Sequence, residues 1–136
     1  MLVVAGSRHP VALEQLARLL AAMPGVPVVS TPAGPADPPQ VEAGIARAVA
    51  ERAAELRSGG WTVVATGGAT ALAVCRALDL KALLPRGEVL PGVPWSEAEA
   101  SALLLVTKAG GFGASEVLVE TVRRLLAEPA AEARVG

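Results

Sequence analysis

Short runs of apolar residues alternate along the chain with longer stretches in which apolar residues recur every three or four positions. The short runs are rich in valine and other strand-forming residues, which predicts strands at 2–5, 26–30, 61–65 and 102–107. The runs 2–5 and 102–107 carry almost no polar residue, as expected of strands buried on both faces. Pro27 cannot donate a ladder hydrogen bond, which places the strand 26–30 at a sheet edge.

The longer stretches predict four helices, at 10–20, 40–57, 71–78 and 115–126. In the first helix, the stripe expected to face the sheet consists of Leu13, Leu16, Leu20 and Met23. In the second helix, the corresponding stripe consists of Val41, Ile45, Val49 and Leu56.

Residues rich in proline, glycine and polar side chains fill the rest of the chain. They predict a loop at 31–39, an irregular segment at 81–86, a short β-like piece with a Pro-Gly turn at 87–94, and a polar loop at 95–101. Residues 1–128 are expected to form one domain and 129–136 a flexible C-terminal tail.

The order of these elements predicts an α/β fold, a three-layer α/β/α sandwich with a mostly parallel sheet in a single domain. In such sheets, ligands bind beyond the carboxyl ends of the strands. Three predicted strands end in glycine-containing turns that lead into helices, at Gly6-Ser7, Gly67-Gly68 and Gly110–Gly113. We therefore expect the three turns to meet at one edge of the sheet.

Turns of this kind favour phosphate groups. Glycine lets the backbone approach a ligand closely, and a helix start offers unpaired N–H groups at the positive end of its dipole. The alternative is that the turns are purely structural, with Thr70 as an N-cap. The glycine spacing matches neither a Walker A loop nor a dinucleotide fingerprint.

For several polar residues near the turns, the sequence allows two roles. Ser7 either donates to an anion or caps a helix, and Arg8 either pairs with phosphate or faces solvent. Lys108 either reaches phosphate oxygens or is a surface lysine. Glu88 either binds Mg²⁺ or a ribose or adenine group, or is an ordinary exposed glutamate. His9 has no orienting partner in the sequence that would make it a general base, and no catalytic residue is identified.

Composition narrows the classes of function. Hydrophobic residues make up 52% of the chain and the mean hydropathy is +0.48, so the chain is expected to fold. A net charge of −1 and an aromatic content of 2% argue against nucleic acid as a partner. One cysteine and one histidine exclude an internal disulfide and a multi-histidine metal site, and no metal ligand is assigned. Without a run long enough to span a membrane or a basic leader, we expect a cytoplasmic protein with no membrane partner.

Four stretches in order give the chain a resemblance to the C-terminal nucleotide-binding domain of the four-carbon acid sugar kinase family. They span nearly the whole chain and are 3–11 with Gln15, 66–71, 87–94 and 108–113. The resemblance implies an ATP-dependent, Mg²⁺-using kinase of acids such as threonate, erythronate or 3-oxo-tetronate. It also implies that a separate domain or subunit binds the sugar acid, so this chain is expected to be inactive alone.

The resemblance implies which residues lie around the nucleotide. These are Ser7, Gly67, Gly68, Ala69, Thr70, Glu88, Gly92, Lys108, Gly110, Gly111, Phe112 and Gly113. The family usually has aspartate where this chain has Ala69, the segment around 31–39 looks shorter, and the sugar-binding domain is absent.

Three readings follow from these departures. The chain is the ATP-binding portion of a sugar-acid kinase, a degenerate module that binds a nucleotide or another phosphate ligand without catalysis, or a domain with purely structural turns. A surface that once met the sugar-binding domain would be apolar, so self-association into a homo-oligomer is also expected.

Overall fold

The computed structural model describes residues 1–31, 37–58, 60–99 and 101–127. The predicted tail 129–136 and most of the predicted loop 31–39 lie outside these ranges.

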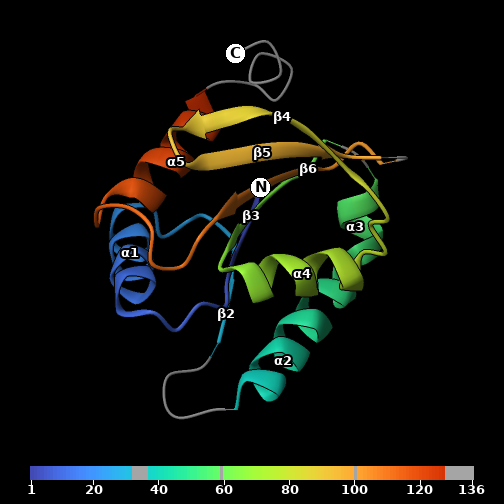
Figure 1. Ribbon diagram of the computed structural model, residues 1–136, viewed down its shortest axis with the longest axis horizontal. Helices are drawn as coiled ribbons and strands as arrows, with labels where there is room; N and C mark the ends of the chain where they lie inside the picture. The colour runs from blue at the N-terminus through green and yellow to red at the C-terminus, as the bar shows by residue number, and fades with distance from the viewer. Residues whose placement is uncertain (32–36, 59, 100, 128–136) are drawn as a thin grey trace.

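A single sheet of six strands organises the molecule (Figure 1). In chain order the elements are β1 (Leu2–Ala5), α1 (Pro10–Ala22), β2 (Val28–Ser30), α2 (Pro38–Glu51), α3 (Ala53–Arg57), β3 (Thr62–Thr66), α4 (Gly68–Ala77), β4 (Leu83–Leu90), β5 (Val93–Ala98), β6 (Leu104–Lys108) and α5 (Val117–Ala127). The strand order is β2-β1-β3-β6-β5-β4. Strands β2, β1, β3 and β6 are parallel, whereas β5 and β4 run antiparallel to their neighbours.

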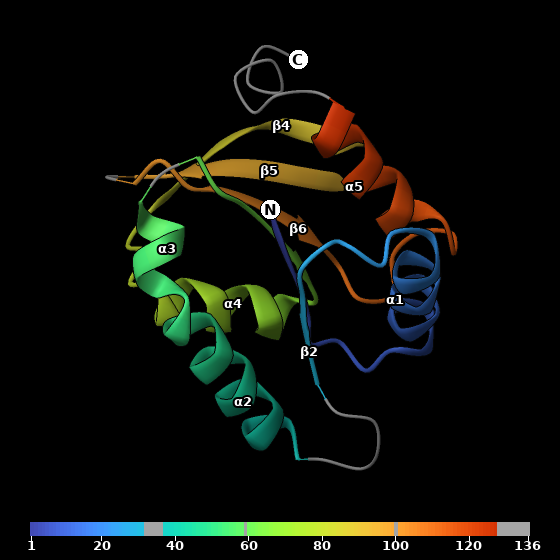
Figure 2. The same cartoon turned by 180° about the vertical axis from the view of Figure 1, so that it is seen from behind.

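Helices cover both faces of the sheet, which confirms the predicted three-layer α/β/α architecture. Helices α1 and α5 lie on one face and α2, α3 and α4 on the other (Figures 1 and 2). Each face has its own apolar core, with Leu19 and Leu118 in one, and Val49 and Leu56 in the other. Strand β2 lies at an edge, as Pro27 predicts.

The antiparallel hairpin β4–β5 occupies most of the segment 81–101. For this segment the sequence predicted a short β-like piece with a Pro-Gly turn at 87–94, between an irregular segment at 81–86 and a loop at 95–101. Val93 and Trp95 are buried and point to the core, and Trp95 pairs with Val106 of β6. Pro94, Ser96 and Glu97 occupy the less buried positions of β5, so its composition resembles that of a loop. The β-like piece and the turn at Pro91-Gly92 are confirmed. The irregular segment 81–86 and the loop 95–101 were wrong, because polar neighbours masked the buried positions of β5.

The helices lie close to their predicted positions, but their buried residues and boundaries differ from the prediction. In α1 the buried residues are Ala12, Gln15 and Leu19, whereas Leu13 and Leu20 are each 46% exposed. The predicted stripe was therefore wrong at Leu13 and Leu20, because the buried positions of α1 include the polar Gln15. It is confirmed at Met23, which is partly buried against the core.

The predicted helix 40–57 is two helices, separated at Arg52, and the first begins earlier than predicted, at Pro38. Proline is favoured in the first turn because its fixed φ suits the helix and its missing N–H needs no partner there. The predicted apolar stripe is confirmed at Ile45, Val49 and Leu56, which are buried. None of the helices among the described residues has both the length and the apolar character needed to span a membrane.

Candidate functional site

The turns that follow β1, β3 and β6 meet at the carboxyl edge of the sheet, as parallel strands require. They line a pocket of about 420 Å³, which we call the turn pocket. The start of α2 forms its remaining wall. The lining residues are Gly6, Ser7, Arg8, His9, Pro38, Val41, Glu42, Ile45, Gly67, Gly68, Ala69, Thr70, Gly110 and Gly111.

The three turns touch one another at positions where a side chain would not fit. A Cβ atom added at Gly6 would overlap the Thr70 hydroxyl, and one added at Gly110 would overlap the Ser7 hydroxyl. Ser7 also lies against Gly67, where an added Cβ would be 3.1 Å from the Ser7 Cβ. The turns thus approach so closely only because these residues are glycines.

The turn between β3 and α4 presents uncapped helix amides to the pocket. Gly67 is the N-cap residue, with φ of +99°, and its N–H donates to the carbonyl of Lys108 at 2.8 Å. No side chain caps α4, and its first turn carries no acidic residue. Thr70 lies inside the helix, so the predicted N-cap role was wrong. The first N–H groups of α4 lie at residues that line the pocket, where an anion can accept from them.

His9, rather than Ser7, caps α1. Its Nδ1 accepts from the N–H of Val11 at 3.1 Å, while the Ser7 hydroxyl oxygen accepts from the N–H of His9 at 3.3 Å. A neutral histidine whose Nδ1 accepts carries its proton on Nε2. That nitrogen lies beside the glycine turn, 3.0 Å from where a Cβ of Gly111 would stand. His9 is therefore arranged as a hydrogen-bond donor at the pocket, and its orienting partner is a backbone amide that the sequence alone does not reveal.

Lys108 is buried, with 2% of its surface exposed, so the surface-lysine reading was wrong. Its Nζ donates to the carbonyls of Ala109, Gly110 and Phe112, the last two at 3.2 and 2.9 Å. Lys108 does not line the turn pocket, and its ammonium points to its own loop. Burial lowers the pKa of Lys108, because the charged form loses its hydration.

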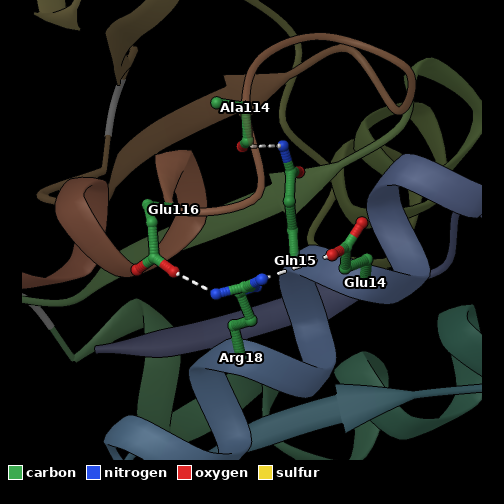
Figure 3. A network of polar contacts seen from close by, with 5 residues as sticks. All are labelled: Glu14, Gln15, Arg18, Ala114 and Glu116. Atoms are coloured by element: carbon green, nitrogen blue, oxygen red, sulfur yellow. Dashed lines mark hydrogen bonds and ion pairs between the residues drawn. The ribbon is translucent and has the colours of Figure 1, made fainter.

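A second buried donor holds the other end of this loop. Gln15 of α1 is fully buried, and its Nε2 donates to the carbonyls of Phe112, Gly113 and Ala114 at 3.0, 3.4 and 2.8 Å. Figure 3 shows the Gln15 side chain reaching from α1 to Ala114. Beside it, an ion pair of 2.7 Å joins Arg18 of α1 to Glu116. We call residues 109–114 the glycine loop.

Glu88 and Gly92 lie away from the turn pocket, at the β4–β5 hairpin. The Glu88 carboxylate accepts from the N–H of Gly92 at 2.8 Å. Gly92 has φ of +84°, and a Cβ added there would overlap the Phe112 ring. The hairpin therefore packs against the glycine loop through the Gly92–Phe112 contact.

The structure brings together seven of the residues named from the sequence and separates five. Those that line the turn pocket are Ser7, Gly67, Gly68, Ala69, Thr70, Gly110 and Gly111. Those that do not line it are Glu88, Gly92, Lys108, Phe112 and Gly113. Whether any of the twelve contacts a nucleotide stays a prediction.

Sequence reasoning missed the wall that α2 contributes. Pro38, Val41 and Ile45 give this wall an apolar surface, and Glu42 gives it a carboxylate. One signal was present: β2 is parallel to β1, so the helix that follows β2 begins at the same sheet edge as the other turns. Among the described residues, no group of three or more histidine, cysteine, aspartate or glutamate side chains gathers to hold a metal ion.

Known proteins resemble this chain in sequence. Residues 27–118 match the family described as nucleotide-binding C-terminal domain. The chain is 41% identical over 86 residues to a D-threonate kinase from Bordetella bronchiseptica, covering 60% of this chain and 21% of that protein. It is 45% identical over 60 residues to a D-threonate kinase from Cupriavidus necator, covering 41% of this chain and 14% of that protein. The chain thus spans 21% or less of the length of these two relatives.

The fold also has a solved counterpart. A domain of unknown function from Bordetella bronchiseptica, solved with bound citrate as a domain-swapped dimer, superposes with a TM-score of 0.74. The sequence identity is 27%, and the match covers 91% of this chain and 40% of that chain. The structural match thus extends over more of the chain than the sequence match to the family.

Burial of Lys108 predicts a pH dependence of stability. The pKa of Lys108 in the folded chain lies below its ordinary value of 10.5, so between these two values the unfolded chain binds more protons. The free energy of unfolding contributed by this residue therefore rises with pH across that window. We expect urea denaturation at a series of pH values to show wild type gaining stability relative to Lys108→Gln, which cannot titrate, as pH approaches 10.5.

Comparing wild type with Lys108→Gln cancels the contributions of other groups that titrate in the same pH range. Burial raises the pKa of Cys75, and the hydrogen bond and charge of Asp79 raise the pKa of Lys81, so both make stability fall with rising pH. These contributions are common to wild type and variant and cancel in the difference. Parallel stability profiles for the two proteins would show that folding does not lower the pKa of Lys108.

Proposed function

Because this chain belongs to the family of nucleotide-binding C-terminal domains, we propose that the turn pocket binds ATP, with its phosphates against the three glycine turns. The convergence of these turns on one pocket carries the proposal. The pocket volume of about 420 Å³ falls in the range of small-molecule sites.

The two sides of the pocket suit the two parts of a nucleotide. On one side, the uncapped first turn of α4 and the glycine turns offer backbone N–H groups, which suit phosphate oxygens. On the other side, Pro38, Val41 and Ile45 of α2 form an apolar wall, which suits the face of a nucleobase. Arg8 and His9 add a cation and a hydrogen-bond donor at the phosphate side.

Mg²⁺ would enter this site with the nucleotide. Magnesium is commonly held by one or two carboxylates together with substrate phosphates, and does not need an all-protein cage. Glu42 is the carboxylate that lines the turn pocket, so it fits this role. The Glu88 carboxylate, which the sequence suggested, accepts from the N–H of Gly92 at the hairpin instead. Bound Mg²⁺ would offset phosphate charge next to the turns.

The relatives suggest the reaction. We propose that this chain is the ATP-binding part of a cytoplasmic kinase that phosphorylates a four-carbon sugar acid such as threonate, erythronate or 3-oxo-tetronate. The two curated relatives are D-threonate kinases of which this chain covers a small part. The acceptor would bind to a separate domain or subunit, without which the chain is inactive. The solved counterpart is a domain-swapped dimer, which supports a homo-oligomer here.

One observation favours a second function. Ala69 lies in the first turn of α4 and lines the pocket, at the position where the family that the sequence resembles usually has aspartate. Loss of a carboxylate beside the phosphates would suit a degenerate module that binds a nucleotide or another phosphate ligand without catalysis.

Two glycine substitutions test nucleotide binding with a built-in control. A Cβ at Gly68 would meet no protein atom within 4 Å, and Gly68 lines the pocket, so Gly68→Ala leaves the fold intact but places a methyl group where phosphate approaches. We expect calorimetry with MgATP to show binding by wild type and about tenfold weaker binding by Gly68→Ala, a loss of ~1.4 kcal/mol.

The control is Gly44→Ala in α2, where a Cβ also meets nothing within 4 Å and which does not line the turn pocket. This variant should gain about 0.5–1 kcal/mol of helix stability and bind MgATP like wild type. Absence of heat with wild type at millimolar MgATP, or equal affinity of Gly68→Ala, would overturn the proposed site.

A substitution at Ala69 distinguishes the ATP-binding part of a kinase from the degenerate module. If the site works as it is, a carboxylate at this position brings negative charge beside the phosphates, and Ala69→Asp binds MgATP no more tightly than wild type. Tighter binding of MgATP by Ala69→Asp, but not by the neutral Ala69→Asn, would favour the degenerate module. Both affinities are measured by the same calorimetric titration.

A further inference from the structure

Two buried side chains hold nearly every carbonyl of the glycine loop. Lys108 donates to the carbonyls of Ala109, Gly110 and Phe112. Gln15 donates to those of Phe112, Gly113 and Ala114, so the Phe112 carbonyl accepts from both. The two donors come from opposite ends of the sequence, and they meet at a loop that borders the turn pocket.

Both donors are enclosed by the protein. Lys108 is 2% exposed and Gln15 is fully buried, and neither lines the turn pocket. No carboxylate among the described residues forms an ion pair with Lys108. A buried ammonium needs hydrogen-bond acceptors to offset the loss of water, and here the loop carbonyls supply them.

The carbonyls fix the direction of the loop amides. In a trans peptide, the carbonyl of one residue and the N–H of the next point in opposite directions, and the described chain has no cis peptide. The carbonyls of Ala109 and Gly110 point to Lys108, so the N–H groups of Gly110 and Gly111 point away from it. Gly110 and Gly111 line the turn pocket.

We propose that Lys108 and Gln15 are positioning residues, which hold the loop carbonyls inward and thereby direct the N–H groups of Gly110 and Gly111 to a phosphate or diphosphate group in the turn pocket. Successive backbone N–H groups that point to one side form an anion-binding concavity. The cation of this loop thus acts on the ligand through the backbone. The identity of the anion as part of ATP rests on the proposed function, whereas the orientation of the amides does not.

The competing explanation is that Lys108 contacts phosphate directly. Replacing Gln15 distinguishes this explanation from the positioning role. Gln15 is uncharged and holds the far end of the same loop. If the lysine charge alone attracted phosphate, replacing Gln15 would leave the response of the glycine amides to an anion unchanged. If the buried donors orient the loop, replacing Lys108 releases the Ala109 and Gly110 carbonyls, whose peptides carry the Gly110 and Gly111 N–H groups. Replacing Gln15 acts on these peptides through the Phe112 carbonyl, which Gln15 shares with Lys108.

The test is an amide ¹H–¹⁵N correlation spectrum of the full chain, titrated with ATP and, separately, with inorganic pyrophosphate. In wild type we expect the Gly110 and Gly111 signals to shift with both probes, together with those of Gly68–Thr70. In Gln15→Leu and in Lys108→Met, we expect the Gly110 and Gly111 shifts to be lost while those of Gly68–Thr70 remain. The dissociation constant for ATP should rise about tenfold, as for loss of hydrogen bonds to a charged group.

Arg18→Met is the matched control, because Arg18 lies on the same helix and pairs with Glu116 without touching the loop carbonyls. It should respond like wild type. Lys108→Met removes one donor from each of three carbonyls, although the Phe112 carbonyl keeps Gln15 and the Ala109 carbonyl keeps the N–H of Phe112. If this variant does not fold, Gln15→Leu and the size-matched Gln15→Glu provide the same test.

Four outcomes are distinguishable. Wild-type Gly110 and Gly111 signals that stay in place with both probes would overturn the inference, as would variants that keep the wild-type shifts. Shifts of these two signals with pyrophosphate but not with ATP would support the orientation of the amides and overturn the nucleotide as ligand. Shifts of Gly68–Thr70 alone with ATP would support the proposed function and overturn the role of the glycine loop.

Discussion

The close approach of three backbone turns is the constraint on which the rest of the structure depends. At Gly6 and Gly110, the space that a Cβ would need is occupied by the hydroxyls of Thr70 and Ser7. Parallel strands bring the turns to one edge of the sheet, but only the missing side chains allow them to touch. The pocket is therefore a consequence of backbone packing, and the peptide groups of its glycines lie beside the polar side chains of Ser7, Arg8, His9, Glu42 and Thr70.

A pocket built from peptide groups needs its amides held in place. Two features do this. The strand β3 ends just before Gly67, whose positive φ starts the first turn of α4 and fixes its amides. In the glycine loop, hydrogen bonds from Lys108 and Gln15 hold the carbonyls. Neither feature costs order at the moment a ligand binds, because both exist in the ligand-free chain. Preorganised donors of this kind suit the positioning and charge stabilisation that phosphoryl transfer requires.

The sequence predicted what depends on local pattern. The apolar runs 2–5 and 102–107 indicated strands buried on both faces, and the order of strands and helices predicted that the turns meet at one edge of the sheet. It could not predict what depends on distant contacts. Trp95 is buried in a strand whose other residues look like a loop, and Gln15 occupies a core position because the glycine loop offers it carbonyls. The direction of the Lys108 ammonium likewise depends on the path of the loop, which no residue pattern specifies.

The most direct measurement is a crystal structure of the full chain with Mg²⁺ and a non-hydrolysable ATP analogue. The account predicts phosphate oxygens within hydrogen-bond distance of the N–H groups of Gly68–Thr70 and of Gly110 and Gly111, with the base against α2. The Lys108 ammonium should keep its contacts with the loop carbonyls. An analogue bound outside the turn pocket, or bound there through side chains alone, would contradict the account.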